Sequence, residues 1–132
     1  MIKKIEGIVI SEIDYKESSK IINILTKEGI IGILAKGTKK VKNKLSGVTS
    51  KLTYGYFHLN YKENGLSTLI EVDIIDNFKN IRKDISLMSY SLYLLELSHR
   101  VYKQCDNISI YDMLIASLKK IEEGLDYKAI TI

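Results

Sequence analysis

Residues 19–37, SKIINILTKEGIIGILAKG, hold two apolar runs separated by the polar turn KEG at residues 27–29. Short apolar bursts bounded by turn residues are typical of β-strands. A buried helix would need a longer uninterrupted pattern than either run offers. This stretch therefore predicts two consecutive strands joined by a turn, and the same pattern continues on both sides of it.

Further strand patterns lie before and after this pair. The preceding segment IEGIVISEID, residues 5–14, reads as a strand. After the pair, KLTYGYFHLNY at 51–61 alternates apolar and polar positions, and the turn KENG leads into LSTLIEVDII at 66–75. Five short strands are too few for a β-sandwich and enough for a small closed barrel. We expect this barrel to occupy residues 1–79.

The second part of the chain changes its hydrophobic period. Between residues 81 and 102 the apolar residues recur every three or four positions, which predicts one amphipathic helix with a broad buried face. The residues of that face are Ile85, Met88, Leu92, Tyr93, Leu94, Leu95, Leu97 and Val101. The expected architecture is α+β, a barrel followed by a helical domain.

Two further helices are expected after the long one. The segment IYDMLIASLKKIEEG, residues 110–124, predicts a helix that ends near Gly124, with capping residues in the preceding DNIS. The last residues, 125–132, resemble the opening of another helix with Asp126 as its cap, and no stop signal follows. We therefore expect a helical domain at residues 80–132 that is incomplete at its C-terminus.

Composition excludes several classes of protein. No apolar stretch approaches the ~20 residues that span a bilayer, and the start of the chain turns acidic where a signal peptide stays apolar. The single cysteine, Cys105, forms neither an internal disulfide nor a cysteine cluster for a metal. A cytoplasmic protein without membrane contact is expected.

Motifs for catalysis and metal binding are also missing. The sequence has neither GxxxxGK[ST] nor GxGxxG. His58 and His99 lie far apart, His58 reads as a residue of the barrel surface, and Cys105 has no evident base to activate its thiol. The sequence predicts a protein that is not an enzyme, with no catalytic residue and no metal ligand.

The strongest functional signal is the segment 36–51, which holds six lysines and no acid. These are Lys36, Lys39, Lys40, Lys42, Lys44 and Lys51. A solvated loop that only keeps the protein soluble is one interpretation. Placement between strands of a barrel, and the closely following Tyr54 and Tyr56, which could stack on bases, favour a nucleic-acid interface. Because lysine is a flexible point charge, the expected contacts are to phosphates and independent of base sequence.

Several segments, in this order and spacing, resemble the RecO recombination-mediator family. They are GIVI (7–10), DYKESSKI (14–21), AKGTKK (35–40), YGYFHL (54–59) and the crossing into the helices at 73–97. The resemblance covers essentially the whole chain. It implies that the barrel is an OB-fold and that the lysines of the segment 36–51 bind DNA. Of these, Lys36, Lys39, Lys40 and Lys44 match the basic positions of the family's "KG" loop.

The resemblance also implies a role in DNA repair and recombination: binding of single- and double-stranded DNA, annealing of complementary strands, and help in loading the recombinase RecA. The implied partners are RecR and the acidic tail of single-strand-binding protein, and the implied location is the nucleoid. The family's cysteine-ligated zinc module has no counterpart in this sequence, so no cofactor is expected. Functions that the family's C-terminal zinc module and later helices supply are not expected of this sequence.

Two other functions fit the residues. One is an RNA-binding OB-fold module, because phosphate contacts do not distinguish the sugars. The other is a protein-interaction scaffold, in which the apolar face of the 81–102 helix is open to a partner and self-association follows.

Overall fold

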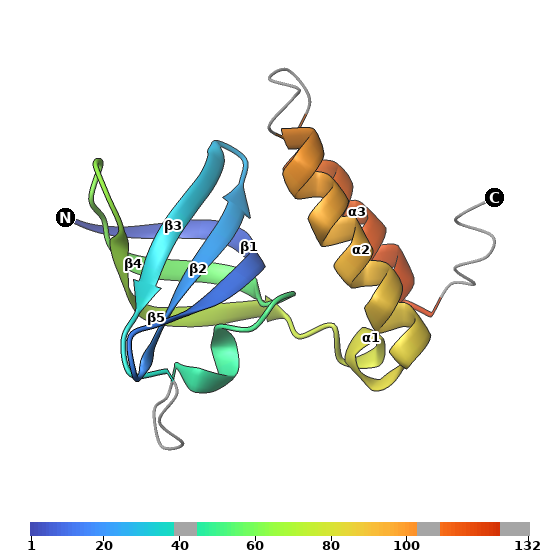
Figure 1. Cartoon of the computed structure of the whole chain (residues 1–132). Coiled ribbons are helices and arrows are strands. Elements are labelled where there is room, and N and C mark those ends of the chain that lie inside the picture. Colours follow the sequence, from blue (N-terminus) through green and yellow to red (C-terminus); the bar gives the residue numbers. More distant parts are fainter. Residues whose placement is uncertain (39–44, 103–108, 125–132) are drawn as a thin grey trace. The chain divides into compact units, whose positions relative to one another are not determined.

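Strands make up the first unit of the chain, residues 1–77 (Figure 1). The structure, a computed structural model, describes residues 1–38, 45–102 and 109–124. Within this part the strands are β1 (Ile2–Tyr15), β2 (Ser19–Thr26), β3 (Gly29–Ala35), β4 (Tyr54–Asn60) and β5 (Ser67–Asp76). They close into a barrel with the order β1-β2-β3-β5-β4. The expected five-stranded OB-fold barrel is confirmed.

The long strand β1 closes the barrel because it pairs with two neighbours. Residues 2–8 pair with β4, and residues 8–15 pair with β2, both in antiparallel register. A register shift between Val9 and Ser11 marks an irregularity at the point where the partner changes, and such bulges bend a strand. The remaining seam is a short parallel pairing of β3 with β5 at Ile33 and Leu34.

Alternating apolar residues of all five strands fill the barrel. The buried cluster is Val9, Ile22, Ile24, Ile33, Ala35, Leu45, Phe57, Leu59 and Leu69. Two glycines face each other across the β1–β4 pair, Gly7 and Gly55. A Cβ atom on Gly55 would collide with the backbone carbonyl of Asp73, so β4 and β5 approach each other here only because position 55 carries no side chain.

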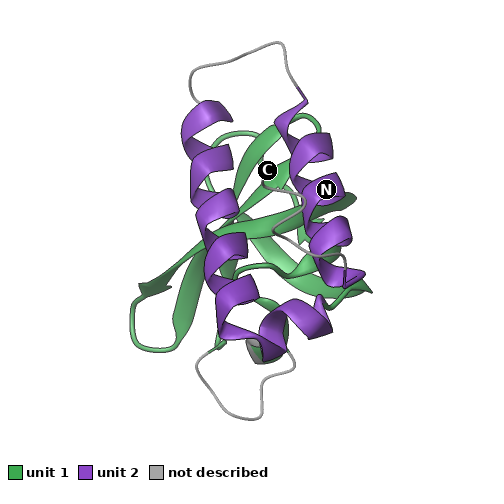
Figure 2. Cartoon of the chain, turned by 90° about the vertical axis from the view of Figure 1, so that its right-hand side faces the viewer, with its two compact units in different colours: residues 1–77 green, residues 78–132 purple. Residues whose placement is uncertain are grey.

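The second unit, residues 78–132, is helical in its described part (Figure 2). Its helices there are α1 (Lys79–Lys83), α2 (Ile85–Tyr102) and α3 (Ile110–Glu122), which confirms helices after the barrel. The expected helix opening at 125–132 lies outside the described residues. No helix in the described part is both long and apolar enough to cross a bilayer.

The single helix expected from residue 81 to residue 102 is wrong, because it is interrupted at Asp84. Asp84 has an extended backbone, with φ −118° and ψ 117°. Its carboxylate oxygen Oδ1 accepts hydrogen bonds from the backbone N–H groups of Ser86, at 2.8 Å, and Leu87, at 3.1 Å. Asp84 therefore caps a new helix, because these are the N–H groups that the first turn leaves without a partner.

The buried face of α2 is narrower than the broad face expected for the long helix. In α2 only Ser91 and Leu95 are buried, and Ile85 is 86% exposed, Tyr93 58% and Leu97 40%. The better-buried helix is α3, with Ile110, Tyr111, Leu114, Ile115, Leu118 and Ile121 buried. Its start and end match the expectation: the side chain of Ser109 accepts from the backbone N–H of Asp112, and Gly124 follows with φ 81°.

The carboxylate of Glu122 at the end of α3 holds the start of α1. It accepts hydrogen bonds from the backbone N–H of Asn80, at 2.9 Å, and of Ile81, at 3.0 Å. The Asn80 side chain donates in turn to the backbone carbonyl of Glu122 at 3.0 Å. Segments that are 41 and 42 residues apart in the sequence are thereby joined, and the N-terminal N–H groups of α1 gain an acceptor.

Candidate nucleic-acid interface

The lysine segment leaves the barrel at the end of β3. Lys36 is exposed and directly follows this strand. Gly37 has φ 70°, a left-handed conformation that favours glycine. The buried Thr38 donates from its hydroxyl to the Ala35 carbonyl at 3.4 Å. The chain is therefore fixed to the barrel up to residue 38. The predicted phosphate ligands Lys39, Lys40, Lys42 and Lys44 lie outside the described residues, so their roles stay predictions.

The segment returns through a buried leucine and a short helix. Leu45 belongs to the barrel core, and η1 (Ser46–Val48) follows it. Lys51 is exposed, and its backbone N–H donates to Oε2 of Glu12 at 2.8 Å. The next residues are tied to β1, because Leu52 N–H donates to the Val9 carbonyl at 3.0 Å. Both flanks of the lysine segment are thus attached to described strands.

These two flanks meet at one end of the barrel. Ala35, next to Lys36, pairs with Lys20 in the β2–β3 register. The Lys20 ammonium contacts Oε1 of Glu12 at 2.9 Å, and the other oxygen of the same carboxylate accepts from Lys51. We call this region the lysine end: the flanks 36–38 and 45–51 together with the β1–β2 turn. Four further lysines are connected to it through residues 39–44.

An open notch of about 440 Å³ lies at the lysine end. Its lining residues are Tyr15, Lys16, Ser18, Ser19, Leu34, Lys36 and Gly37. Lys16 adopts a left-handed backbone conformation, with φ 56°, and its ammonium nitrogen lies 5.3 Å from the ring centre of Tyr15. Two ammonium groups beside serine hydroxyls are the donors that bind phosphate oxygens.

Lys16 and Lys20 differ in their surroundings, although they are close in sequence. The Lys20 side chain is 18% exposed and forms an ion pair with Glu12. Lys16 is exposed, contacts the ring of Tyr15 and lines the notch with Lys36. Sequence reasoning missed Lys16, because the nearby Asp14 and Glu17 cancel its charge in any count along the chain.

The two tyrosines expected to stack on bases occupy different environments. Tyr54 is only 4% exposed, so its ring cannot reach a base while the core is intact, and the stacking role expected for it is wrong. Alternation along β4 predicts the face of the strand on which Tyr54 lies, but not whether that face is covered. Tyr56 is 37% exposed, but the Lys4 ammonium lies 4.7 Å from its ring centre. Stacking by Tyr56 stays a prediction.

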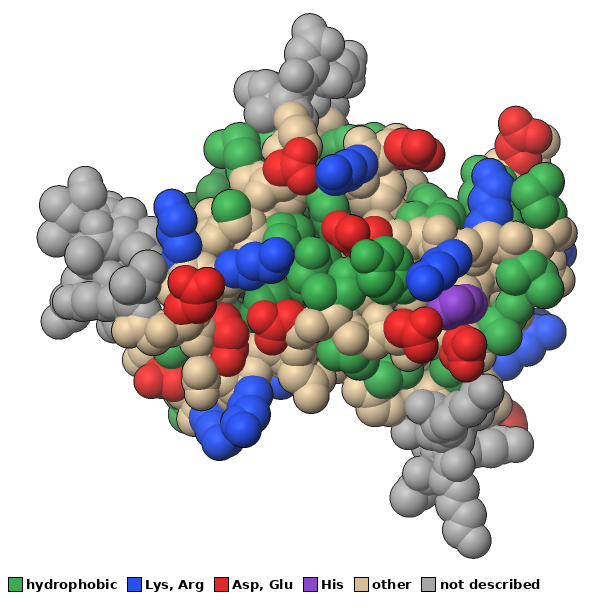
Figure 3. Space-filling model, turned by 180° about the vertical axis from the view of Figure 1, so that it is seen from behind, with side chains coloured by type: hydrophobic (Ala, Val, Ile, Leu, Met, Phe, Trp, Pro, Cys, Tyr) green, Lys and Arg blue, Asp and Glu red, His purple; other side chains and the backbone are tan. Residues whose placement is uncertain are grey.

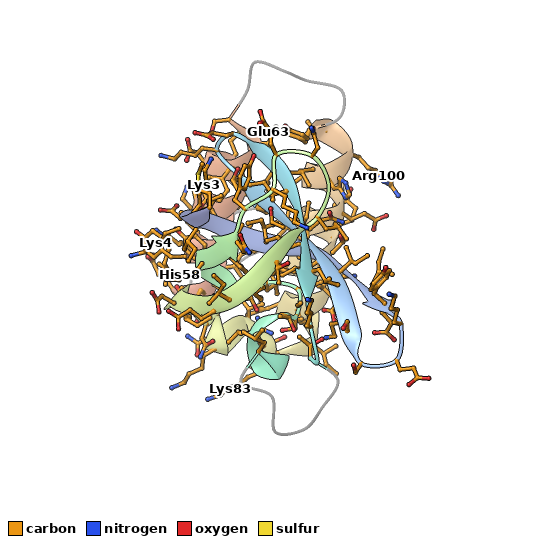
Figure 4. The ribbon with its side chains drawn as sticks, turned by 90° about the vertical axis from the view of Figure 1, so that its left-hand side faces the viewer. Lys3, Lys4, His58, Glu63, Lys83 and Arg100 are labelled. Carbon is orange, nitrogen blue, oxygen red and sulfur yellow. The ribbon has the colours of Figure 1, made fainter. Side chains whose placement is uncertain are left out.

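Tyr56 belongs to a second, mixed-charge surface, the outer β1–β4–β5 face. Its six side chains come from facing positions of the three strands. They are Lys4, Glu6, Tyr56, His58, Glu71 and Asp73. With His58 neutral, three acids and one lysine give −3 + 1 = −2. Figure 4 shows Lys4 and His58 on the same side of the barrel. A net negative surface repels phosphates, so this face does not extend the lysine end.

The comparisons with known proteins cover the barrel and, for the relatives, nearly the whole chain. The family model described as "Recombination protein O N terminal" matches residues 1–78. "DNA repair protein RecO" of Listeria welshimeri is 39% identical over 131 residues, which are 98% of this chain and 51% of that protein. The protein of the same name from Bacillus subtilis is 39% identical over 133 residues, 99% of this chain and 52% of its own length. The chain thus spans about half the length of these curated relatives.

Proposed function

The chain belongs to the RecO family, whose model covers more than half of its length, and from this premise we propose that it binds the phosphate backbone of DNA at its lysine end. The observation that carries the proposal is the attachment of both flanks of the lysine segment beside a notch lined by Lys16 and Lys36. The names of the relatives, "DNA repair protein RecO", support a role in DNA repair, and the proposed binding would serve that role.

The proposed mechanism is electrostatic. The six lysines of the segment 36–51 are close in sequence and repel one another, and a chain of phosphates bound to them relieves that repulsion. Each phosphate contact releases condensed counterions. Because lysine offers no planar fork for a base edge, the contacts are the same for every base sequence. Two strands gathered at the same end have their mutual repulsion screened, which favours annealing without any bond being made or broken by the protein.

The test is a salt series of binding measurements. We would measure fluorescence anisotropy of labelled single-stranded DNA, duplex DNA and single-stranded RNA with the unsubstituted chain and with Lys39→Glu plus Lys40→Glu. We expect the affinity to fall with salt by a log–log slope of about −0.7 per phosphate contact on single strands. The double substitution should weaken binding by about 10- to 100-fold, because each of the two lost contacts between exposed charges is worth up to about 1 kcal/mol, and the two added carboxylates repel phosphates.

A matched control keeps the total charge the same. Lys119→Glu plus Lys120→Glu changes an adjacent lysine pair on α3, and either double variant takes the net charge from +4 by −4 to 0. The two double variants differ only in the place where the charge is changed. If both variants lose the same affinity, binding depends on net charge and the lysine end is not the site. Circular dichroism confirms that each variant is folded. Tighter binding of RNA than of single-stranded DNA would favour the RNA-binding alternative.

The RecR-like partner and the tail of single-strand-binding protein remain proposals that rest on family membership, and no described residue is assigned to them. Self-association has one observation in its favour, which is the set of exposed apolar side chains on the second unit. Ile85, Tyr93 and Leu97 of α2 and Met113 of α3 are each at least 40% exposed. Gel filtration of the unsubstituted chain without DNA, over a range of concentrations, detects it.

A further inference from the structure

The outer β1–β4–β5 face carries a group of side chains that DNA binding does not use. His58, Glu71 and Asp73 each offer one ligand atom, and these three atoms lie within 4.8 Å of one another. His58 Nε2 and Asp73 Oδ2 are 2.7 Å apart. Figure 3 shows a histidine side chain with acidic side chains directly beside it. One imidazole nitrogen and two carboxylate oxygens thus converge on one point of the surface.

A β-bulge creates this convergence. In the β4–β5 register, Leu59 pairs with Leu69, but His58 pairs with Glu71 and not with Ile70. Without the extra residue in β5, regular pairing would set Glu71 opposite the buried Phe57, on the inner face. The bulge therefore turns Glu71 and Asp73 outward beside His58. Bulges of this kind re-aim side chains and are frequent next to functional sites.

The side chains have the freedom that a metal site needs. The His58 side chain is 23% exposed, so the strands hold its imidazole, whereas the Asp73 side chain is 58% exposed. Zinc bonds of about 2.0–2.2 Å in a tetrahedron place neighbouring ligand atoms about 3.3 Å apart. The Asp73 carboxylate has to move away from Nε2 by about half an ångström to admit the ion, which an exposed side chain does by a small rotation.

Charge also favours a cation here. The segment 36–51 holds six lysines and no acid, whereas the six residues of the outer β1–β4–β5 face sum to −2 with His58 neutral. Lys4 faces His58 in the β1–β4 register, yet its ammonium lies over the Tyr56 ring, 4.7 Å from the ring centre. A metal ion bound here would replace the hydrogen of the 2.7 Å contact between His58 Nε2 and Asp73 Oδ2, since a ligating imidazole is neutral and a ligating carboxylate ionised.

We propose that His58, Glu71 and Asp73 form a binding site for a divalent transition-metal ion of the zinc type. Imidazole nitrogen with carboxylate oxygen is a ligand set that zinc accepts. Three protein ligands leave a fourth position open to water. The site does not depend on the phosphate contacts proposed for the lysine end. It departs from the expectation that the sequence holds no metal ligand, because two of the three ligands become neighbours of His58 only through the bulge.

The experiment is isothermal titration calorimetry with zinc alone as the probe. The protein is the full 132-residue chain, free of any affinity tag, treated with a chelator and carrying Cys105→Ser so that the thiol does not bind zinc. We expect one zinc ion per chain. His58→Gln should weaken binding at least tenfold, because even residues that only support metal ligands are worth about 10- to 100-fold. Asp73→Asn should weaken it in the same direction.

The matched control is His99→Gln, which removes the other histidine of the chain and should leave zinc affinity unchanged. Asp73→Asn changes an exposed side chain, so its effect cannot be attributed to unfolding, and ¹⁵N spectra of His58 locate zinc at Nε2. Absence of binding at millimolar zinc would overturn the site. So would equal affinity of the His58→Gln and His99→Gln proteins, which would assign the zinc to other surface carboxylates.

Discussion

The lysine end and the outer β1–β4–β5 face belong to the same barrel, yet they carry opposite charge. At the lysine end the cations are neighbours in sequence, since six lysines fall between residues 36 and 51. On the outer β1–β4–β5 face the charged groups come from three strands, and Lys4, His58 and Glu71 are brought into one row by strand pairing alone. The charge of the lysine segment comes from residues that are neighbours in sequence. The charge of the outer β1–β4–β5 face comes from residues that only strand pairing brings together.

This difference explains why the two surfaces have separate proposed ligands. A run of lysines needs no defined geometry to attract a polyanion, because the attraction acts at long range and is screened only by salt. A metal ion needs ligand atoms within a few tenths of an ångström of fixed positions. Here paired strands supply such positions, and they depend on the bulge that shifts the register between His58 and Leu59.

The largest effect is expected on the free energy of unfolding, from substitution of the two tyrosines of β4. The two substitutions test whether Tyr54 is buried and Tyr56 partly exposed. Tyr54→Ala should lower the free energy of unfolding by about 3 kcal/mol, because a buried aromatic ring leaves a cavity. Tyr56→Ala should cost about 1 kcal/mol or less, since the ring is partly exposed and its contact with the Lys4 ammonium is a surface cation–π pair. Urea denaturation followed by circular dichroism measures both. Equal losses would contradict the different environments of the two rings.

A smaller effect is expected from the notch at the lysine end. Lys16→Gln should weaken single-stranded DNA binding by about threefold and reduce the salt slope by about 0.7, the signature of one phosphate contact. Lys27→Gln is the matched control, because Lys27 lies in the turn between β2 and β3, at the opposite end of β2. Anisotropy titrations over several salt concentrations provide both quantities. Suppose that the salt slope is unchanged for Lys16→Gln but binding is lost in the Lys39→Glu plus Lys40→Glu protein. The notch would then not contact DNA, whereas the lysine segment would still be the binding site.

The smallest effect is expected from neutralising the acids of the outer β1–β4–β5 face. Glu71→Gln plus Asp73→Asn removes two negative charges, yet DNA affinity should stay within about twofold, because exposed charges beyond a Debye length of about 8 Å are screened at physiological salt. The same anisotropy titration measures it. A clear gain in affinity would show that DNA lies close to this face. The two surfaces would then not have separate ligands.

Strand positions followed from the sequence more closely than helix positions did. The run predicted at residues 19–26 coincides with β2, because short apolar bursts between turn residues leave few alternatives. The helix break at Asp84 was missed. A spacing of three or four residues continues across the break, so the period alone does not detect it. The available signal was an aspartate directly before α2, whose carboxylate accepts from the N–H groups of Ser86 and Leu87.

The candidate site was predictable in its charges but not in its geometry. The lysines of the segment 36–51 are visible in the sequence, and two of them, Lys36 and Lys51, lie at the same end of the barrel. Tyr54 was assigned to the surface because alternation predicts the face of a strand on which a side chain lies, but not whether that face is covered, and Tyr54 is only 4% exposed. Lys16 was left out because its left-handed backbone and its position beside Lys36 come from the turn conformation.

By itself, the sequence determined the strand and helix periods, the end of the barrel pattern before residue 80 and the collection of lysines in one connection, since all of these are local in the chain. Only the tertiary structure decided which side chains face one another: Lys16 with Lys36 across the notch, Glu122 with the start of α1, and His58 with Glu71 and Asp73. The physical reason is that strand register and bulges add or remove single residues of offset, and one residue moves a side chain from the core to the surface.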